Sequence, residues 1–211
     1  MTKLTPHETW HQFDASKIQQ YMDCPRKYFY RYILGWDNEI TSVHLVFGEA
    51  YHIAQNYCAH NGYGNEAIMA ATKLATEFYR QYFPPELDDA CYPKVPSQIP
   101  VALVAYTDRF DEADEGKLEF SEVGVVAQLN NGFEVIGRMD AIRKGNGGIY
   151  GIEHKTASRK TNDKYQLSMQ ISLYSHVLFC YYGLEYVAGI EVREAIFSKS
   201  RGVEIESSTI R

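Results

Sequence analysis

The spacing of apolar residues changes near Gly116, and that change restricts the folds open to this chain. Before Gly116 apolar residues recur every three or four positions, as in helices, and in most segments after it they alternate, as in strands. Asn130-Asn131-Gly132 and Gly145-Asn146-Gly147-Gly148 have the composition of tight hairpin turns. The sequence therefore predicts an α+β fold, with helices first and then a βββαβ series.

The expected elements form one domain of 211 residues, with a helical part over about 14–115 and a mixed part over about 116–211. We expect Ser16 to cap the first helix and Pro25 to restart it at a first-turn position, where its missing N–H costs nothing. Further helices are expected at residues 43–60, 65–82, 98–114 and 163–182. Strands are expected at residues 118–129, 133–144, 148–156, 186–197 and, with a weaker pattern, 202–210.

Acidic residues and a lysine occupy two neighbouring predicted strands. Asp140 ends the run Gly137-Arg138-Met139-Asp140, and Glu153 and Lys155 stand two apart on the next strand. Because residues two apart in a strand face the same side, Glu153 and Lys155 project together and His154 faces the other way. One carboxylate from each strand could hold a magnesium ion, and the lysine could orient an attacking water. A solvated Glu/Lys pair on an edge strand is the ordinary alternative.

Two helical segments add residues at a spacing of four. Gln170 and Tyr174 follow the strands and share one helix face, and Gly48 and His52 precede them in an otherwise apolar segment. Spacing alone would leave Gln170 and Tyr174 as surface residues. A lone histidine on an apolar helix is likewise more often a core residue than a metal ligand. A functional role for these residues is indicated only when they are considered together with the strand motifs.

In this order the motifs resemble the RecB-like branch of the PD-(D/E)XK nuclease superfamily, which includes CRISPR-associated adaptation nucleases and helicase-attached exonuclease domains. The resemblance spans nearly the whole chain. It rests on five segments: the N-terminal signature at 16–32, Gly-x-x-x-His at 48–52, Gly-x-x-Asp at 137–140, Glu-x-Lys at 153–155 and Gln-x-x-x-Tyr at 170–174. The fold that it implies is a restriction-endonuclease-like αβββαβ core with an N-terminal helical cap.

The resemblance also implies a function, that of a metal-dependent DNA nuclease, and within this branch an exonuclease is expected. The implied catalytic residues are Asp140, Glu153 and Lys155. The implied ligands of one or two Mg²⁺ or Mn²⁺ ions are His52, Asp140, Glu153 and the backbone carbonyl of His154. Because imidazole suits manganese better than magnesium, Mn²⁺ is expected to support activity well. Gln170 and Tyr174 are expected to contact the DNA backbone or to brace Lys155.

Several further side chains are open candidates. Arg138 lies on the strand face of Asp140 and is expected to contact a substrate phosphate, with Lys160 and Lys164 as weaker candidates. Glu122, on the first predicted strand, could also reach the site. The aromatic residues Tyr28, Phe29, Tyr30 and Tyr32 could stack on unpaired bases, but we expect them in the helical core.

The net charge of −6 is unusual for a protein that binds DNA. Residues 84–96 and 108–122 account for all of this negative charge, whereas the segments that carry the motifs are locally basic. DNA remains the expected partner, and a separate helicase, integrase or single-strand annealing protein could act with so small a protein. The alternative is a nuclease-like subunit that binds DNA or a partner protein and is inactive alone.

The four cysteines, Cys24, Cys58, Cys91 and Cys180, include no Cys-x-x-Cys pair. Many CRISPR-associated relatives hold an iron–sulfur cluster through one N-terminal and three C-terminal cysteines. Cys24 stands at the first of these positions, but no cysteine follows Cys180, so we expect no cluster and a buried Cys24. The chain has no run of 18 apolar residues and no signal-peptide pattern, so a cytoplasmic protein without a membrane span is expected.

Overall fold

The computed structural model describes residues 8–37, 41–110, 117–129, 132–145, 147–160 and 165–211. Its α-helices are α1 (Ala15–Asp23), α2 (Pro25–Tyr28), α3 (Val43–Asn61), α4 (Asn65–Tyr79), α5 (Asp88–Cys91), α6 (Ile99–Arg109) and α7 (Met169–Tyr182). A π-helical turn covers Phe29–Ile33, and short 3₁₀ turns cover Glu8–His11, Pro85–Leu87, Pro96–Gln98 and Leu184–Tyr186. The strands are β1 (Gln12–Phe13), β2 (Lys117–Gln128), β3 (Glu134–Gly145), β4 (Gly148–Ala157), β5 (Val187–Ser198) and β6 (Gly202–Ile210).

The strands form one mixed sheet in which β3 is paired on both edges. β2 runs antiparallel along one edge of β3. β1 and β4 share the other edge, β1 in parallel at Glu134 and Val135 and β4 antiparallel from Ala141 to Gly145. Residues 136–140 of β3 lie between these two partners, and no described strand pairs with them on that edge. β5 then runs parallel to β4, and β6 runs antiparallel to β5.

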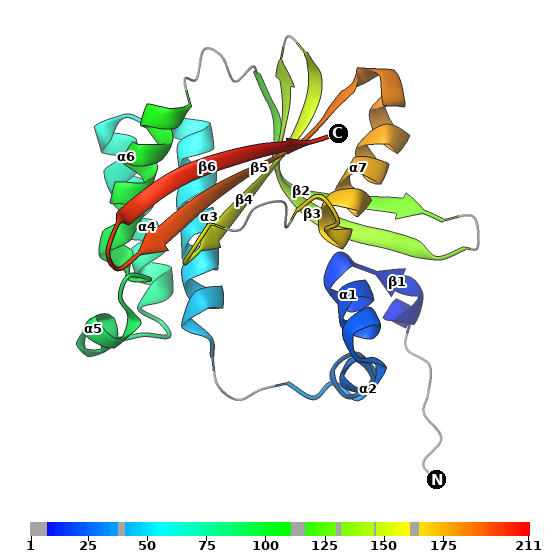
Figure 1. The fold of residues 1–211 in the computed structure, drawn as a ribbon, viewed down its shortest axis with the longest axis horizontal. Coiled ribbons are helices and arrows are strands. Elements are labelled where there is room, and N and C mark those ends of the chain that lie inside the picture. Colours follow the sequence, from blue (N-terminus) through cyan, green and yellow to red (C-terminus); the bar gives the residue numbers. More distant parts are fainter. Residues whose placement is uncertain (1–7, 38–40, 111–116, 130–131, 146, 161–164) are drawn as a thin grey trace.

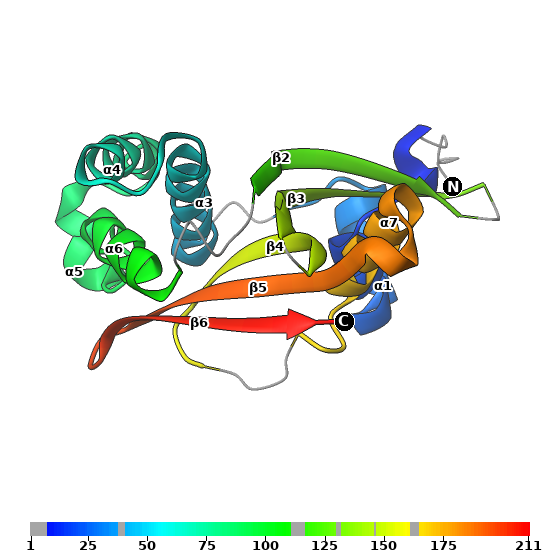
Figure 2. The same ribbon diagram turned by 90° about the horizontal axis from the view of Figure 1, so that it is seen from above.

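The two faces of β5 belong to two different cores. Ile190 and Val192 pack with α7, whereas Ala195 and Phe197 pack with α3, α4 and α6. Because alternate residues of a strand face opposite sides, these two groups of helices cover opposite faces of the sheet. Figure 1 shows α3, α4 and α6 grouped toward one end of the sheet and α7 with α1 toward the other, and Figure 2 shows the same separation from above.

The buried side chains of α3 and α4 form part of one hydrophobic core. They pack against one another, against α6 and against residues of β5 and β6. Among the described residues, no helix combines the length and the apolarity needed to cross a membrane.

The order of elements agrees with the predicted α+β fold, but some helix ends differ. Asp14, not Ser16, caps α1, because Oδ1 of Asp14 accepts a hydrogen bond from the backbone N–H of Lys17 at 2.8 Å. Pro25 stands in the first turn of α2, as predicted. α4 ends at residue 79 and α6 at residue 109, earlier than expected, although residues 111–114 lie outside the described residues.

The last helix also begins later than predicted. α7 starts at Met169, and of the preceding segment expected to be helical, residues 163 and 164 lie outside the described residues. The hydroxyl of Tyr165 donates to Oε1 of Glu194 on β5 at 2.5 Å. This contact draws the segment before α7 toward the sheet, and the chain there forms a turn rather than another turn of helix.

The aromatic residues that follow Pro25 do not form a helical core. None of the residues of α1, α2 or the π-helical turn is buried. The expectation that Tyr28, Phe29, Tyr30 and Tyr32 lie in the interior is therefore wrong. The physical reason is that α3, α4 and α6 build their core with one another and the sheet, while α1 packs beside α7 instead. Cys24 is likewise exposed rather than buried.

Candidate active site

The strands β3 and β4 part where the predicted acidic residues stand. Their pairing ends at Ala141 opposite Ile152, and β4 continues beside β5 through Ala157. The backbone N–H of His154, which lies beyond the last β3 pair, donates to Oδ2 of Asp140 at 2.6 Å. The Asp140 carboxylate thus bridges β3 and β4 at the point where they separate, and this backbone donor fixes its position.

Glu153 and Lys155 both face α7, as the alternation along the strand predicted. Lys155 Nζ lies 2.6 Å from Oε1 of Glu153. Gln170 of α7 contacts both residues: its amide nitrogen donates to Glu153 Oε1 at 2.9 Å, and its amide oxygen accepts from Lys155 Nζ at 2.8 Å. Since a carboxylate only accepts and an ammonium only donates, one orientation of the Gln170 amide satisfies both neighbours.

Tyr174, one turn after Gln170, lies directly against Gly137 of β3. A Cβ atom on Gly137 would lie 2.9 Å from Cε1 of Tyr174, closer than such atoms pack. The Tyr174 hydroxyl accepts from Gln170 Nε2 at 2.9 Å and donates to the backbone carbonyl of Arg138 at 2.5 Å. The glycine of one motif and the tyrosine of another are therefore the two sides of a single contact between α7 and β3.

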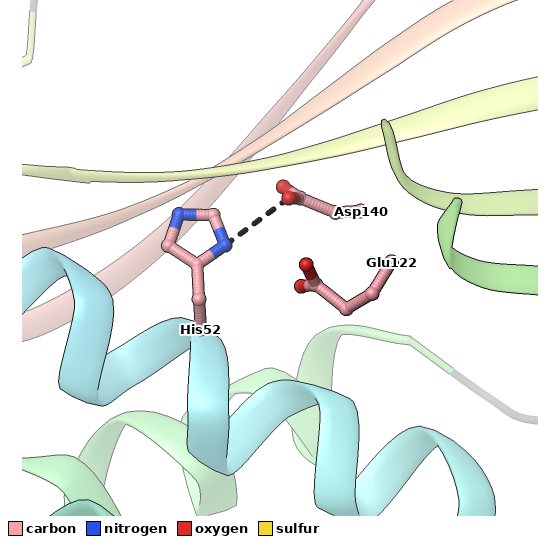
Figure 3. A group of neighbouring side chains, drawn as sticks. All are labelled: His52, Glu122 and Asp140. Carbon is pink, nitrogen blue, oxygen red and sulfur yellow. Dashed lines mark ion pairs between the residues drawn. The ribbon is translucent and has the colours of Figure 1, made fainter. Parts of the chain in front are cut away.

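A second group of ligand atoms meets Asp140 from the side of α3. His52 Nδ1 lies 3.2 Å from Oδ1 of Asp140. Glu122 of β2 completes a group whose ligand atoms all lie within 4.8 Å of one another. Figure 3 shows the three side chains converging from α3, β2 and β3.

The backbone of Glu122 is unusual. Its φ is 47°, a left-handed value that residues other than glycine adopt rarely. Glu122 falls between the register pairs Ser121–Ala141 and Val123–Met139, which places it across from Asp140. Backbone strain of this kind costs on the order of 1–3 kcal/mol and concentrates at functional sites.

Glu153 is the most deeply buried of the three acids, with 3% of its side chain exposed. Its Oε1 is engaged by Lys155 and Gln170, but Oε2 is buried without a hydrogen-bond partner. Burial, assisted by the negative charge of Asp140, raises the pKa of Glu153 to about 7 despite the opposing charge of Lys155. An unpartnered buried carboxylate oxygen is costly, so this position favours a proton or a cation beside it.

The contact between His52 and Asp140 shifts both pKa values. Burial alone would lower the pKa of His52, but the hydrogen bond and charge of Asp140 outweigh it and raise that pKa. Burial alone would raise the pKa of Asp140, but the hydrogen bond with His52 and the neighbouring histidine charges lower it. Burial and the charge of Asp140 raise the pKa of Glu122. His52 therefore favours the ionised form of Asp140, whereas burial favours the protonated form of Glu122.

The imidazole of His154 lies on the opposite face of β4. Its Nε2 is 3.4 Å from the hydroxyl of Tyr106 on α6, and burial lowers the pKa of His154 to about 3. The ring is therefore neutral at neutral pH and belongs to the core beneath the site. Only the backbone of His154 reaches the point where β3 and β4 separate, through its contact with Asp140.

A cleft of about 860 Å³ opens along the edge of β3 that no strand of the described residues covers. Its lining includes His52, Asp140, Glu153 and Lys155, and α7 contributes Gln170, Leu173 and Tyr174. The opposite wall is α1 and the start of α2, with residues 15, 16, 19, 20, 23 and 27. Arg138 lines the cleft with 60% of its side chain exposed, and its Nε lies 3.0 Å from Oε2 of Glu122.

The weaker candidates are not brought to this cleft. Lys160 Nζ donates to Glu206 of β6 at 2.8 Å and lines a separate hollow beside that strand. Lys164 lies outside the described residues. Among the described residues, the cluster of potential metal ligands with atoms this close contains no cysteine.

Sequence reasoning left two features of the site incomplete. Glu122 is only an open candidate in the sequence, yet counting back along the strands from the turn predicted at 130–132 places it across from Asp140. The wall formed by α1 carries no such signal. Its position depends on β1, and a strand of two residues is too short to show a period.

The chemistry of these side chains suits a hard divalent cation. Carboxylate oxygens favour Mg²⁺ and Mn²⁺, and an imidazole is compatible with Mn²⁺. Lys155 adds to the same cleft an ammonium that is held by Glu153 and Gln170. The arrangement can therefore hold a cation and also present a positive group to an anionic substrate.

Comparison with known proteins gives one family. The family model of the PD-(D/E)XK nuclease superfamily matches residues 12–180, from β1 through most of α7. A crystal structure named "Putative exonuclease" from Eubacterium rectale is similar with a TM-score of 0.58 at 14% identity, over 100% of this chain and 79% of that chain. A second structure, named SSO0001, matches at 15% identity over 84% of this chain and 71% of that chain, with a TM-score of only 0.30. No curated protein matches.

Proposed function

The chain belongs to the PD-(D/E)XK nuclease superfamily, and we propose that it hydrolyses DNA phosphodiester bonds with Mg²⁺ or Mn²⁺, as an exonuclease. Membership of the family and the fold shared with a protein named as an exonuclease support a hydrolytic nuclease. Beyond this, we propose DNA as the substrate, Mg²⁺ or Mn²⁺ as the ion and exonuclease action. Asp140, Glu153 and Lys155 are the proposed catalytic residues.

The proposed cation ligands are His52, Glu122, Asp140, Glu153 and the backbone carbonyl of His154. The unpartnered Oε2 of Glu153 supports this set, because a cation would supply the partner that a buried carboxylate oxygen needs. The N–H and C=O of one strand residue point to the same side. Because the His154 N–H is directed at Asp140, its carbonyl is directed to the same side.

When bound there, a divalent cation supplies Lewis acidity, which lowers the pKa of water and offsets charge on a phosphate. The fixed protein groups supply the rest. Of the three N–H donors of Lys155, two are directed to Glu153 and Gln170. The third is available at the cleft to orient a water molecule or a phosphate oxygen, where a preorganised donor stabilises developing negative charge.

Gln170 and Tyr174 were expected either to contact DNA or to brace Lys155, and we propose bracing. The polar atoms of both side chains are already used within the protein: Gln170 with Glu153, Lys155 and Tyr174, and Tyr174 with the backbone of Arg138. The exposed guanidinium of Arg138 remains the proposed phosphate contact. In this scheme Glu122 positions Arg138 at the cleft.

One observation carries the proposal. The Gln170 amide bonds both Lys155 and the buried Glu153, one oxygen of which has no partner, beside the point where β3 and β4 separate and Asp140 lies. A cleavage assay tests it. Linear duplex, single-stranded and closed circular DNA, with a matched RNA strand, would be incubated with Mg²⁺ or Mn²⁺. We expect metal-dependent loss of linear DNA only, abolished by a chelator and greatly reduced in Lys155→Ala. Lys160→Ala, which removes a lysine bound to Glu206 instead, should retain activity.

Each other outcome has a defined meaning. Cutting of closed circles would contradict the exonuclease assignment and leave the chemistry intact. Cleavage by Lys155→Ala at the wild-type rate would contradict the site. No cleavage by the wild type would contradict an enzyme that acts alone, and activity that appears only with an added helicase or annealing protein would make the chain a partner-dependent subunit.

A further inference from the structure

We infer that the segment from Cys24 to Trp36 is a stacking platform for an unpaired nucleic acid strand that enters or leaves the active-site cleft. The inference rests on the proposed function for the identity of the cleft. The platform itself is defined by α2, the π-helical turn and the residues up to Trp36. It has no part in the proposed chemistry, so the two can be tested separately.

The platform carries aromatic rings that the fold leaves uncovered. Tyr30 and Trp36 are stacked, with ring centroids 4.9 Å apart and an interplanar angle of 24°. Trp36 is nevertheless 63% exposed, and Phe29 is 39% exposed. Most of the Trp36 surface thus remains open to solvent beside an existing stack, and an unpaired base could extend that stack. Base–aromatic stacking of this type is tolerant of sequence.

Positive charge is interleaved with these rings. Between residues 24 and 36 the chain has three basic residues, Arg26, Lys27 and Arg31, and no acidic residue, although its net charge is −6. The Arg26 guanidinium lies 5.7 Å from the centre of the Tyr30 ring. Arg31 pairs with Asp37 at 3.7 Å, but both side chains are well exposed, so this pair is screened and weak. Alternating cations and aromatic rings match a phosphate backbone with unpaired bases.

The platform is continuous with the active-site cleft. Residues of α1 form the cleft wall, and Lys27 of α2 is the last residue of that wall. Tyr30 lies three residues after Lys27 in the continuing helical segment, and residues at this spacing are neighbours on a helix surface. The Tyr30–Trp36 stack therefore begins one helical turn beyond the end of the cleft. A strand whose scissile phosphate lies near Lys155 would have its neighbouring nucleotides led toward the rings.

Binding of a fluorescent oligothymidylate in the presence of a chelator tests the inference without any catalysis. The proteins compared would be the wild type, Tyr30→Ala, Trp36→Ala and Trp36→Phe. We expect the Kd to rise about tenfold for each alanine variant and to stay within about twofold for Trp36→Phe, which keeps a ring. Tyr186→Ala is the matched control, because Tyr186 is also an exposed ring, at 61%, but lies next to β5.

A second readout uses the tryptophan itself. In a Trp10→Phe background, which leaves Trp36 as the one tryptophan of the chain, the oligonucleotide should quench its fluorescence. Unchanged Kd values in both alanine variants, or no quenching, would overturn the platform even if cleavage is observed. Ring-dependent binding by a protein that does not cut DNA would support the platform and contradict the proposed function. A change of oligomeric state in Trp36→Ala with unchanged Kd would identify the surface as an interface between copies and overturn the inference.

Discussion

The ring of Tyr174 occupies the space where a side chain at Gly137 would begin, with Cε1 only 2.9 Å from the position of a Cβ atom. This contact joins α7 to β3 and sets the distance between Gln170 and the two strands that carry the acids. It explains physically why a glycine three residues before Asp140 and a tyrosine four residues after Gln170 occur together. The position of Lys155 depends on it indirectly, through Gln170.

Gly137→Ala tests that contact. The added methyl group must displace a buried ring whose hydroxyl is held at both sides, so we expect a loss of about 1–3 kcal/mol in the free energy of unfolding. Nuclease activity should fall by more than this destabilisation explains at a temperature where the variant is folded. Gly124→Ala on β2 is the matched control, since a Cβ atom there meets nothing within 4 Å. Equal melting curves for the two variants would contradict the prediction.

Gln170→Ala should separate positioning from metal binding. Without the amide, Lys155 loses one acceptor and Glu153 loses one donor, while the proposed cation ligands all remain. Because loss of such supporting contacts typically costs about 10–100-fold in activity, we expect a fall in kcat of that size. The Mn²⁺ concentration that gives half-maximal rate should change little. Ser172→Ala, on an exposed face of the same helix, should behave as the wild type.

Glu153 should make the metal-free protein less stable as pH rises. Its pKa is about 7 in the folded protein, above the ordinary value of 4.5. Stability is therefore complete below pH 4.5, falls as pH rises toward 7, and is constant above that. The shift corresponds to at most about 3.5 kcal/mol at about 1.4 kcal/mol per pH unit.

Glu153→Gln removes this titration, and thermal unfolding with a chelator measures it. We expect the variant to melt several degrees above the wild type at pH 8 and not at pH 4.5. Added Mn²⁺ at pH 8 should raise the melting temperature of the wild type and have little effect on the variant. A variant that is less stable than the wild type at pH 8 would contradict the prediction that the buried Glu153 charge destabilises the folded protein.

Much of this arrangement follows from residues that neighbour one another in the sequence. The alternation along β4 correctly predicted that Glu153 and Lys155 face one side and His154 the other. The spacing of four correctly placed Gln170 and Tyr174 on one helix face. Such periods are local properties of the backbone, so a sequence exposes them directly.

Other features depend on contacts between distant segments and could not be read in this way. Oε2 of Glu153 is buried without a hydrogen-bond partner, and the burial of one atom depends on how distant segments pack around it. The aromatic rings after Pro25 look like core residues in sequence, but the helices that would cover them pack elsewhere. The cap of α1 is Asp14 because the chain enters the helix from β1, which no periodic pattern marks.

Asp14→Ala tests the origin of the cleft wall. The Asp14 carboxylate satisfies the Lys17 N–H, and loss of such a cap costs about 1 kcal/mol. We expect faster amide hydrogen exchange over residues 15–23 and a weaker affinity for DNA, with little change in the exchange of β4. Ser16→Ala should leave the exchange of α1 unchanged. Protection lost equally in both variants would contradict the assignment of the cap.

The assembly of a cation site from three strands and α3 can be tested by one titration of the single-turnover cleavage rate against Mn²⁺ concentration. The proteins would be the wild type, Glu122→Gln and Lys155→Ala. We expect no cleavage in a chelator and a saturable rise with Mn²⁺ for the wild type. Glu122→Gln should need about tenfold more Mn²⁺ for half-maximal rate and reach a similar plateau, whereas Lys155→Ala should lower the plateau without shifting the midpoint. Cleavage that persists in the chelator, or the same Mn²⁺ dependence and plateau in all three proteins, would contradict the proposed site.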